Sequence, residues 1–176
     1  GVQTCALPIW VVEGPQASAA RYGGACATFG RARLAGFGAA GRLAALAERV
    51  ATGCSSAGLS LFAGWRTASL PDDDAGRAFV LCHVLRELRG SAHLVAVVAA
   101  GLTPLEAVLA TAGTEGAERF GWTGPFPEVT PDTKAPAERL TDEIVTRCYR
   151  ASLDDREIDE LADLADDTRA YLDASA

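Results

Sequence analysis

The stretch that decides the fold is Arg77 to Gly113, RAFVLCHVLRELRGSAHLVAVVAAGLTPLEAVLATAG. Its pattern predicts a long helix, a tight Gly-Leu-Thr turn and a second helix. At about 100° per residue, one side of the long helix is apolar, and that side should face the core. Its members are Leu81, Val84, Leu85, Leu88, Ala92, Val95 and Ala99.

The other side of the long helix is polar over its middle turns. His83, Arg86, Gly90 and His93 fall within roughly 80° of one another on a helical projection. Beyond His93 apolar residues surround the helix, and a helix that is apolar on every side is normally buried. We therefore expect the polar side to enter the interior at His93, and we expect a kink or break near Gly90.

Both ends of this unit carry local signals. Pro71 and three aspartates, Asp72 to Asp74, favour a helix start because carboxylates stabilise the N-terminal dipole. Gly101 suits a helix C-terminus. Thr103 followed by Pro104 and Glu106 forms the pattern of a capping box with proline at the first helical position. The pattern predicts a helix-turn-helix core over residues 72–113.

Helices are also predicted around this core, over residues 16–34, 42–52, 136–151 and from 153 onward. In the second of these, Leu43, Leu46, Ala47 and Val50 should face inward. Residues 55–74 and 114–134 read as irregular, and the aromatic residues at 120, 122 and 126 leave room for a short β-hairpin. The predicted fold class is mostly α, a helical domain with a winged-helix-like middle and at most a short hairpin.

Composition narrows the functional classes. The chain has 176 residues and a formal net charge of −7, enough length for a sizeable core. An acidic chain argues against a nucleic-acid partner, because such proteins usually show a basic patch. No apolar run of about 18 residues lacks a charge or a helix stop, so no membrane span is expected.

The five cysteines, Cys5, Cys26, Cys54, Cys82 and Cys148, are widely scattered and include no CxxC pair. This spacing matches neither a disulfide framework nor a zinc site. We expect buried, reduced thiols and a cytoplasmic protein.

The first nine residues, GVQTCALPI, differ from the rest of the chain. They resemble the translation of a sequencing-library adapter, and the chain contains no methionine. We treat residues 1–9 as a non-native artefact, and residues 10–176 as one α-helical domain that lost its true N-terminus. A signal-like segment is the competing interpretation, but a charged n-region is missing.

The order helix, turn, capped helix and possible hairpin is that of a winged helix-turn-helix. The chemistry of the second helix argues against DNA binding. PLEAVLATAG contains no Arg, Lys, Asn or Gln, the side chains that make bidentate contacts to bases. The loop after it offers Arg119 and Lys134 as cations for phosphate. Even within a winged helix, we expect this helix to be a core element.

A polar cluster on the long helix is the best candidate binding site. His83, Arg86 and His93, with Glu87 beside them, suit a small anionic ligand such as a carboxylate or phosphate. The two histidines lie about 15 Å apart along a straight helix and could share a metal only if it broke at Gly90. The sequence favours a plainer interpretation without a ligand. In it, His83 and Arg86 are solvated or ion-paired, and His93 lies in the core with its hydrogen bonds satisfied.

No motif supports an enzyme. The serines occur in no GxSxG elbow, the cysteines have no histidine at a recognisable spacing, and no GxGxxG or Walker loop is present. The sequence therefore gives no catalytic residue, no metal ligand set and no cofactor. The acidic pairs near the C-terminus read as a solvated helix face.

Several segments nevertheless resemble a known family. LCHVLRELRGSAHLVAVVAAGLTPLEA, followed by ERFGWTGPFPEV, is similar to the actinobacterial SalK/EvbL-like proteins, which carry a helix-turn-helix label. The shared features are Arg89-Gly90 with His93, Gly101 to Ala107, Phe120 to Val129, and Leu140 to Asp142, with LFAGWR at Leu61 to Arg66. The resemblance covers about residues 25–171, whereas family members have a longer N-terminal part. It implies a winged-helix-like fold and a regulatory role, and it transfers no reaction or cofactor.

Three hypotheses follow. The first is a non-catalytic binding or regulatory protein with a small anionic ligand at His83, Arg86, Glu87 and His93. The second is a DNA-binding regulator, which predicts a basic face built from Arg31, Arg33, Arg42, Arg49 and Arg119 that is not neutralised by neighbouring acids. The third is an enzyme with His83 and His93 in one closed pocket. The sequence leaves ligand identity and oligomeric state open.

Overall fold

The computed structural model describes residues 14–174, and every regular element in that range is helical. The elements are α2 (Pro15–Arg33), α3 (Ala40–Gly53), α4 (Ser60–Trp65), α5 (Asp74–Ala99), α6 (Pro104–Arg119), the 3-10 helix η1 (Pro131–Lys134), α7 (Ala135–Arg150) and α8 (Asp155–Ala174). The predicted mostly-α fold is confirmed. Residues 1–9, interpreted as an artefact, lie outside the described residues.

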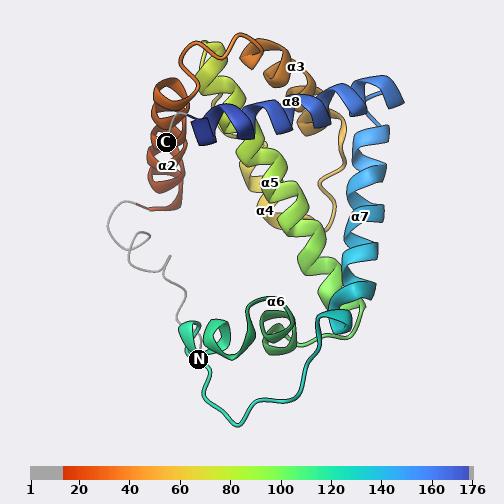
Figure 1. Cartoon of the computed structure of the whole chain (residues 1–176). Coiled ribbons are helices and arrows are strands. Elements are labelled where there is room, and N and C mark those ends of the chain that lie inside the picture. Colours follow the sequence, from red (N-terminus) through yellow and green to blue (C-terminus); the bar gives the residue numbers. More distant parts are fainter. Residues whose placement is uncertain (1–13, 175–176) are drawn as a thin grey trace.

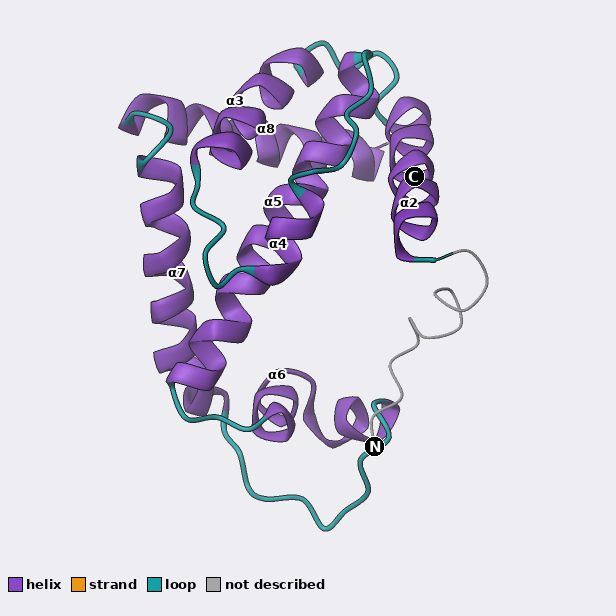
Figure 2. Ribbon diagram, turned by 180° about the vertical axis from the view of Figure 1, so that it is seen from behind, coloured by secondary structure: helices purple, strands orange, loops and turns teal. Residues whose placement is uncertain are grey.

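Helix α5 is the axis of the molecule. α2, α3, α4 and α7 all pack along it, and α8 crosses over one end of it, where it contacts α3 (Figure 1). α6 lies at the opposite end of α5, away from α8, in both ribbon views (Figure 2). Residues 77–113, from which the fold was predicted, therefore run from the main helical body into α6.

The core lies between α3, α4 and α5. Leu46, Val50, Phe62 and Leu88 are all fully buried, at 0% exposure. The four residues predicted to face inward in α3 are each at most 1% exposed, which confirms the pattern there. Burying a side chain of this size stabilises the fold by about 1.5–3 kcal/mol.

The last turns of α5 are not buried as predicted. Leu94, Val95 and Val98 are 57%, 40% and 76% exposed. α7 covers the side of α5 that carries Ala96 and Val97, against Ala137. α6 bends away at 114° to α5, and the other side of α5 stays partly exposed. α5 is also continuous through Gly90, with no break there.

Two segments predicted to be irregular contain helix. The segment before α5 forms α4, anchored by Phe62, whose backbone N–H donates to Ser91 Oγ at 3.1 Å. α6 continues past residue 114 to Arg119, with a kink at Gly113 (φ 65°, ψ −165°). Residues 120–130 form no strand. Pro125 and Pro127 lack the N–H donors that a hairpin ladder needs, which explains why the allowed hairpin is absent.

The cysteine prediction is wrong for one pair. Cys54 and Cys148 form a disulfide with Cα atoms 4.8 Å apart, although 94 residues separate them in sequence. The fold places the end of α3 against α7, a proximity that cysteine spacing does not reveal. Cys26 and Cys82 are free thiols.

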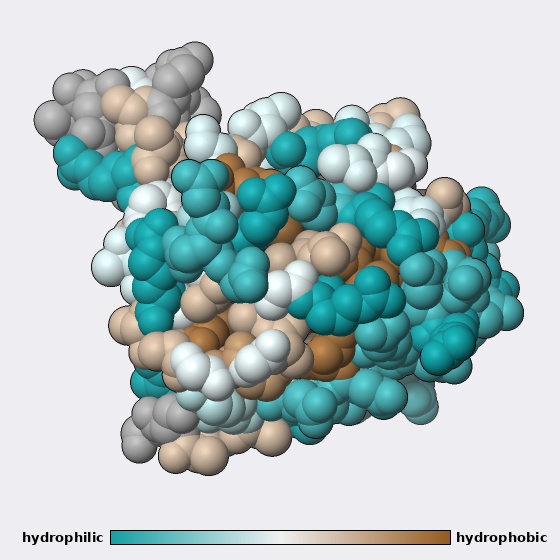
Figure 3. All heavy atoms as spheres, turned by 90° about the horizontal axis from the view of Figure 1, so that it is seen from above, coloured by the Kyte–Doolittle hydropathy of each residue, from teal (hydrophilic) through white to brown (hydrophobic). Residues whose placement is uncertain are grey.

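The surface is mainly hydrophilic where it is seen from the end that carries α3 and α8, with hydrophobic side chains visible toward the middle of that face (Figure 3). Within the described residues, no single helix is both long enough and apolar enough to cross a membrane. Only α5 and α6 taken together reach that composition, and they are bent by 114°.

Candidate functional site

The end of α5, the turn after it and α6 form a helix-turn-helix. The two helices meet at 114°, within the range of about 90–120° that this motif uses. Gly101, at φ +75°, makes the turn. Its N–H donates to the carbonyl of Val98 at 3.0 Å, and the N–H of Leu102 donates to that of Val97 at 3.1 Å. The predicted turn is in place.

The predicted capping box starts α6. Thr103 Oγ1 accepts from the backbone N–H of Glu106 at 3.2 Å, and Glu106 Oε2 accepts from the backbone N–H of Thr103 at 2.8 Å. The backbone N–H and the hydroxyl of Thr103 both donate to Glu106 Oε2, and these two bonds lower the pKa of the Glu106 carboxyl. The box fixes the direction in which α6 leaves the turn, and Thr103, Pro104 and Thr111 remain exposed along it.

The attachment of α6 to the rest of the molecule is narrow. A small cluster of Ala96 and Val97 from α5 and Ala137 from α7, with Leu102, Ala107 and Leu140 around it, forms the apolar joint. α6 otherwise packs mainly on η1, where Lys134 Nζ donates to Thr111 Oγ1 at 3.4 Å. The position of α6 therefore depends on η1 and the start of α7.

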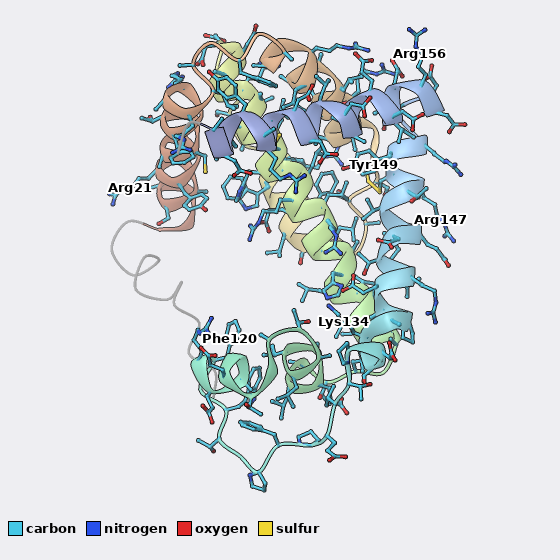
Figure 4. The ribbon with its side chains drawn as sticks, viewed as in Figure 1. Arg21, Phe120, Lys134, Arg147, Tyr149 and Arg156 are labelled. Atoms are coloured by element: carbon cyan, nitrogen blue, oxygen red, sulfur yellow. A yellow bond between two sulfur atoms is a disulfide. The ribbon has the colours of Figure 1, made fainter. Side chains whose placement is uncertain are left out.

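Three basic side chains surround one carboxylate beside this joint. Glu138 on α7 lies 3.0 Å from Arg89 Nη2, 3.4 Å from Lys134 Nζ and 4.0 Å from His93 Nδ1. Burial would raise the pKa of Glu138, but the bond from Lys134 and the nearby positive charges lower it. Lys134 lies where α7 begins, beside the end of α5 (Figure 4). We call Arg89, His93, Lys134 and Glu138 the joint cluster, and its cations outnumber its single acid.

His93 is held by a defined partner within this cluster. Its Nδ1 lies 3.1 Å from the hydroxyl of Thr141, which is fully buried and donates to the carbonyl of Ala137 at 2.7 Å. With that proton committed, Thr141 Oγ1 is the acceptor for His93, so Nδ1 carries the hydrogen. His93 is thus a bonded, partly exposed side chain between α5 and α7.

His83 occupies a different environment. Its ring lies 4.2 Å from that of Trp65 and 5.6 Å from that of Tyr22, centroid to centroid. Its Nε2 lies 3.8 Å from Glu87, which also pairs with Arg86 at 2.5 Å. Burial lowers the pKa of His83, and the charge of Glu87 opposes that shift. The rings are close enough to pack on one another rather than to enclose a ligand.

The structure divides the predicted ligand site into two parts. His83, Arg86 and Glu87 come together next to α2 and α4, whereas His93 turns toward α7. The two cavities described are lined by other residues. One, of about 230 Å³, lies between α7 and α8, and the other, of about 600 Å³, lies between α6 and residues 126–130. No group of three or more metal-ligating side chains occurs within residues 14–174.

The predicted basic face is also absent. Arg31 pairs with Asp73, Arg42 with Glu160, Arg49 with Glu157 and Arg119 with Glu115. Arg33 donates to the carbonyl of Leu172 at 2.9 Å. These arginines mostly connect α2 and α3 to other helices, so they act as structural ties.

Glu138, Lys134 and Thr141 were not predicted from the sequence as partners of the polar side of α5. One local signal was present: Lys134 and Glu138 stand four residues apart, the spacing of a helical ion pair. Nothing in the sequence showed that this pair would reach Arg89 and His93, more than 40 positions earlier. The pairing depends on how α7 packs on α5.

One comparison with known proteins gives a match. The model of a family described as "Helix-turn-helix family" matches residues 3–125, which is well over half of the chain and includes α5, the turn and α6. No curated protein and no solved structure matches.

This match corrects the prediction that nucleic acid is an improbable partner, because a helix-turn-helix family indicates nucleic-acid binding. That prediction relied on the net charge of the whole chain and on the composition of one helix. Cations from other elements gather at the joint, which neither quantity records.

Proposed function

The chain belongs to this helix-turn-helix family, and we propose that it is a DNA-binding regulatory protein that contacts DNA through α6 and the joint cluster. The observation that carries the proposal is the 114° bend between α5 and a capped α6 within the matched region. A DNA-binding regulator works in the compartment that contains DNA, and we propose the cytoplasm as its location. The narrower assignment to SalK/EvbL-like proteins also stays a proposal, supported by the motifs from Arg89 to Val129.

The exposed start of α6 suits the groove side of the contact. In this motif the N-terminal residues of the second helix meet base edges. Here they are Thr103 and Pro104, both exposed. A threonine hydroxyl bonds to base edges, and threonine and proline carbons contact thymine methyl groups. The contacts to bases would then be mainly hydrogen bonds from hydroxyl groups and apolar contacts with methyl groups.

The joint cluster suits the phosphate side. Arg89 is 55% exposed at its side chain, and Lys134 27%. An exposed ion pair is worth at most about 1 kcal/mol, so a phosphate can replace Glu138 as the partner of the exposed Arg89. Lys134 is only partly exposed, and it adds a second positive charge beside the same position. Phosphate contacts of this kind supply most of the affinity of non-specific binding.

The test is the affinity of the full chain for a duplex selected by it from random-sequence DNA, measured by fluorescence anisotropy over a range of salt concentrations. Arg89→Ala and Lys134→Ala should each weaken binding roughly fivefold or more, and each should lower the salt slope by about 1. Glu138→Gln should strengthen binding, because it removes the competing carboxylate.

The matched control is Arg169→Ala. Arg169 pairs with Asp166 at 3.4 Å on α8, at the end of the molecule opposite α6. This variant should bind like the wild type. A chain that selects no duplex at low salt, or that loses equal affinity in the Arg169 and Arg89 variants, would contradict the proposal.

A small anionic ligand at His83, Arg86 and Glu87 is not favoured as a second function. Arg86 and His83 already face Glu87, and the aromatic rings of Tyr22 and Trp65 pack against the remaining side of His83.

A further inference from the structure

We propose that Cys54 and Cys148 are a reversible redox site, oxidised to a disulfide by peroxide, and that the oxidised state binds DNA more tightly than the reduced one. This inference rests on the proposed function. It adds regulation by an oxidant, which the DNA-binding role alone does not imply.

The first observation is the position of the pair. Cys54 caps the end of α3, and Cys148 lies on α7, 94 residues later, with Cα atoms 4.8 Å apart. That separation lies within the range of disulfides, about 4.4–6.8 Å, so no large backbone movement is needed to form or break the bond. The yellow sulfur–sulfur bond beside α7 in Figure 4 marks the site.

The second argument is the compartment that the proposed function implies. A DNA-binding regulator works where thiols are kept reduced, and disulfides there are usually transient and either catalytic or redox-sensing. A cysteine pair held at bonding distance in such a protein is therefore suited to respond to an oxidant.

The third observation is the difference among the described thiols. Burial raises the pKa of Cys82 to about 11, and burial also raises that of Cys26, so both react poorly as thiolates. By contrast, Cys54 and Cys148 lie close enough to bond to each other, and Cys148 is only partly buried. Cys148 is the more exposed of the pair, since Cys54 is 2% exposed.

The chemistry balances with peroxide as the oxidant. The thiolate of Cys148 attacks one peroxide oxygen, which breaks the O–O bond, releases hydroxide and leaves a sulfenic acid on Cys148. The thiolate of Cys54 then attacks that sulfur, forms the S–S bond and expels the sulfenic oxygen as water. Two thiols lose two electrons and two protons, and one peroxide becomes two waters. A dithiol reverses the step by thiol–disulfide exchange.

The bond has a structural route to the DNA-binding segment. It ties α7 to α3, and α7 continues N-terminally into η1, on which α6 mainly packs. α7 also carries Glu138 of the joint cluster. The described structure combines the disulfide with the helix-turn-helix geometry, so we assign this geometry to the oxidised state. After reduction, α7 is still packed on α5 but has lost its covalent tie to α3.

The experiment uses the full chain with Cys5→Ser, so that a cysteine outside the described residues cannot exchange. The reduced protein is treated with hydrogen peroxide and then with dithiothreitol, and thiols are counted by alkylation and mapped by mass spectrometry. Peroxide should remove two thiols, map them to Cys54 and Cys148, and raise the midpoint of thermal unfolding by roughly 10 °C. Dithiothreitol should restore both thiols.

The second readout is affinity for the selected duplex. The oxidised form should bind at least about fivefold more tightly than the reduced form. Cys54→Ser and Cys148→Ser should keep the reduced affinity under both treatments, whereas the control Cys26→Ser should switch like the wild type.

The outcomes separate the two proposals. If both redox forms bind the duplex equally, or if dithiothreitol cannot open the bond in the folded protein, the redox switch is wrong and the proposed function stands. Oxidation that maps to other cysteines also overturns the switch. If neither form binds any duplex, the proposed function fails and the switch fails with it.

Discussion

Burial differs sharply between leucines of the same helix, and this difference decides what each contributes. Leu88 on α5 is fully buried, whereas Leu94, less than two turns later, is 57% exposed. Both were expected to be buried, because the apolar pattern continues along the helix. The pattern indicates which side of a helix can be covered, but the neighbouring elements determine where the cover ends.

Replacing these two leucines tests that difference. Leu88→Ala should lower the free energy of unfolding by about 2–5 kcal/mol, since it leaves a cavity in the core. Leu94→Ala should change it by no more than about 0.5 kcal/mol. Chemical denaturation of both variants measures the effect. A loss at Leu94 as large as that at Leu88 would show that the side chain is covered in solution.

His83 should make stability depend on pH. Burial lowers the pKa of His83 below the ordinary value of about 6.5 for histidine, so below about pH 6.5 the unfolded chain binds a proton that the folded chain resists. Stability should therefore decrease as the pH falls from above 6.5 toward the folded-state pKa. Thermal unfolding at pH 7.5 and 5.5 should show a smaller loss for His83→Gln than for the wild type. Equal losses in His83→Gln and in the wild type would contradict the role of His83.

At the scale of the element, α6 begins at the residue that its local sequence predicts. The threonine, proline and glutamate of the capping box act within one turn, so a single sequence suffices to find them. The inward face of α3 was also predicted correctly, because a short amphipathic helix has one apolar side to cover. By contrast, the joint cluster combines α5, η1 and α7, and the disulfide joins α3 to α7. Such contacts depend on packing between distant segments, which periodicity does not specify.

The hydroxyl of Thr103, which caps α6, should contribute more to the free energy of unfolding than other hydroxyls on this helix. Thr103→Ala removes the acceptor for the N–H of Glu106 and should cost about 1 kcal/mol of unfolding free energy. Thr111→Ala, on the same helix, removes an exposed hydroxyl that bonds to the carbonyl of Ala107, and should cost much less. Denaturant titrations of both variants measure the difference. If Thr111→Ala proved the more harmful, the start of α6 would not be held by its capping box.

At the scale of the whole molecule, the two ends of α5 have different roles. One end lies in a packed body, where α2, α3 and α4 cover it and ion pairs such as Arg42–Glu160 tie α3 to α8. The other end supports α6 through a small apolar joint and a cluster of cations. Net charge, taken over the whole chain, pointed away from nucleic acid, and residues 104–134 alone carry five acids and two bases. Neither number records that Arg89 and Lys134 come together beside Glu138 at the joint. The distribution of charge, rather than its total, is what bears on the partner.

Hydrogen exchange with and without the selected duplex tests the central claim most directly, because it reports where on the chain DNA is bound. The account predicts slower amide exchange on DNA binding at the turn, at the start of α6 and around residues 130–139, with no change on α8. Protection confined to α8 or to the α2–α3 end, or no protection anywhere at saturating duplex, would contradict the claim that this helix-turn-helix is a DNA-binding surface.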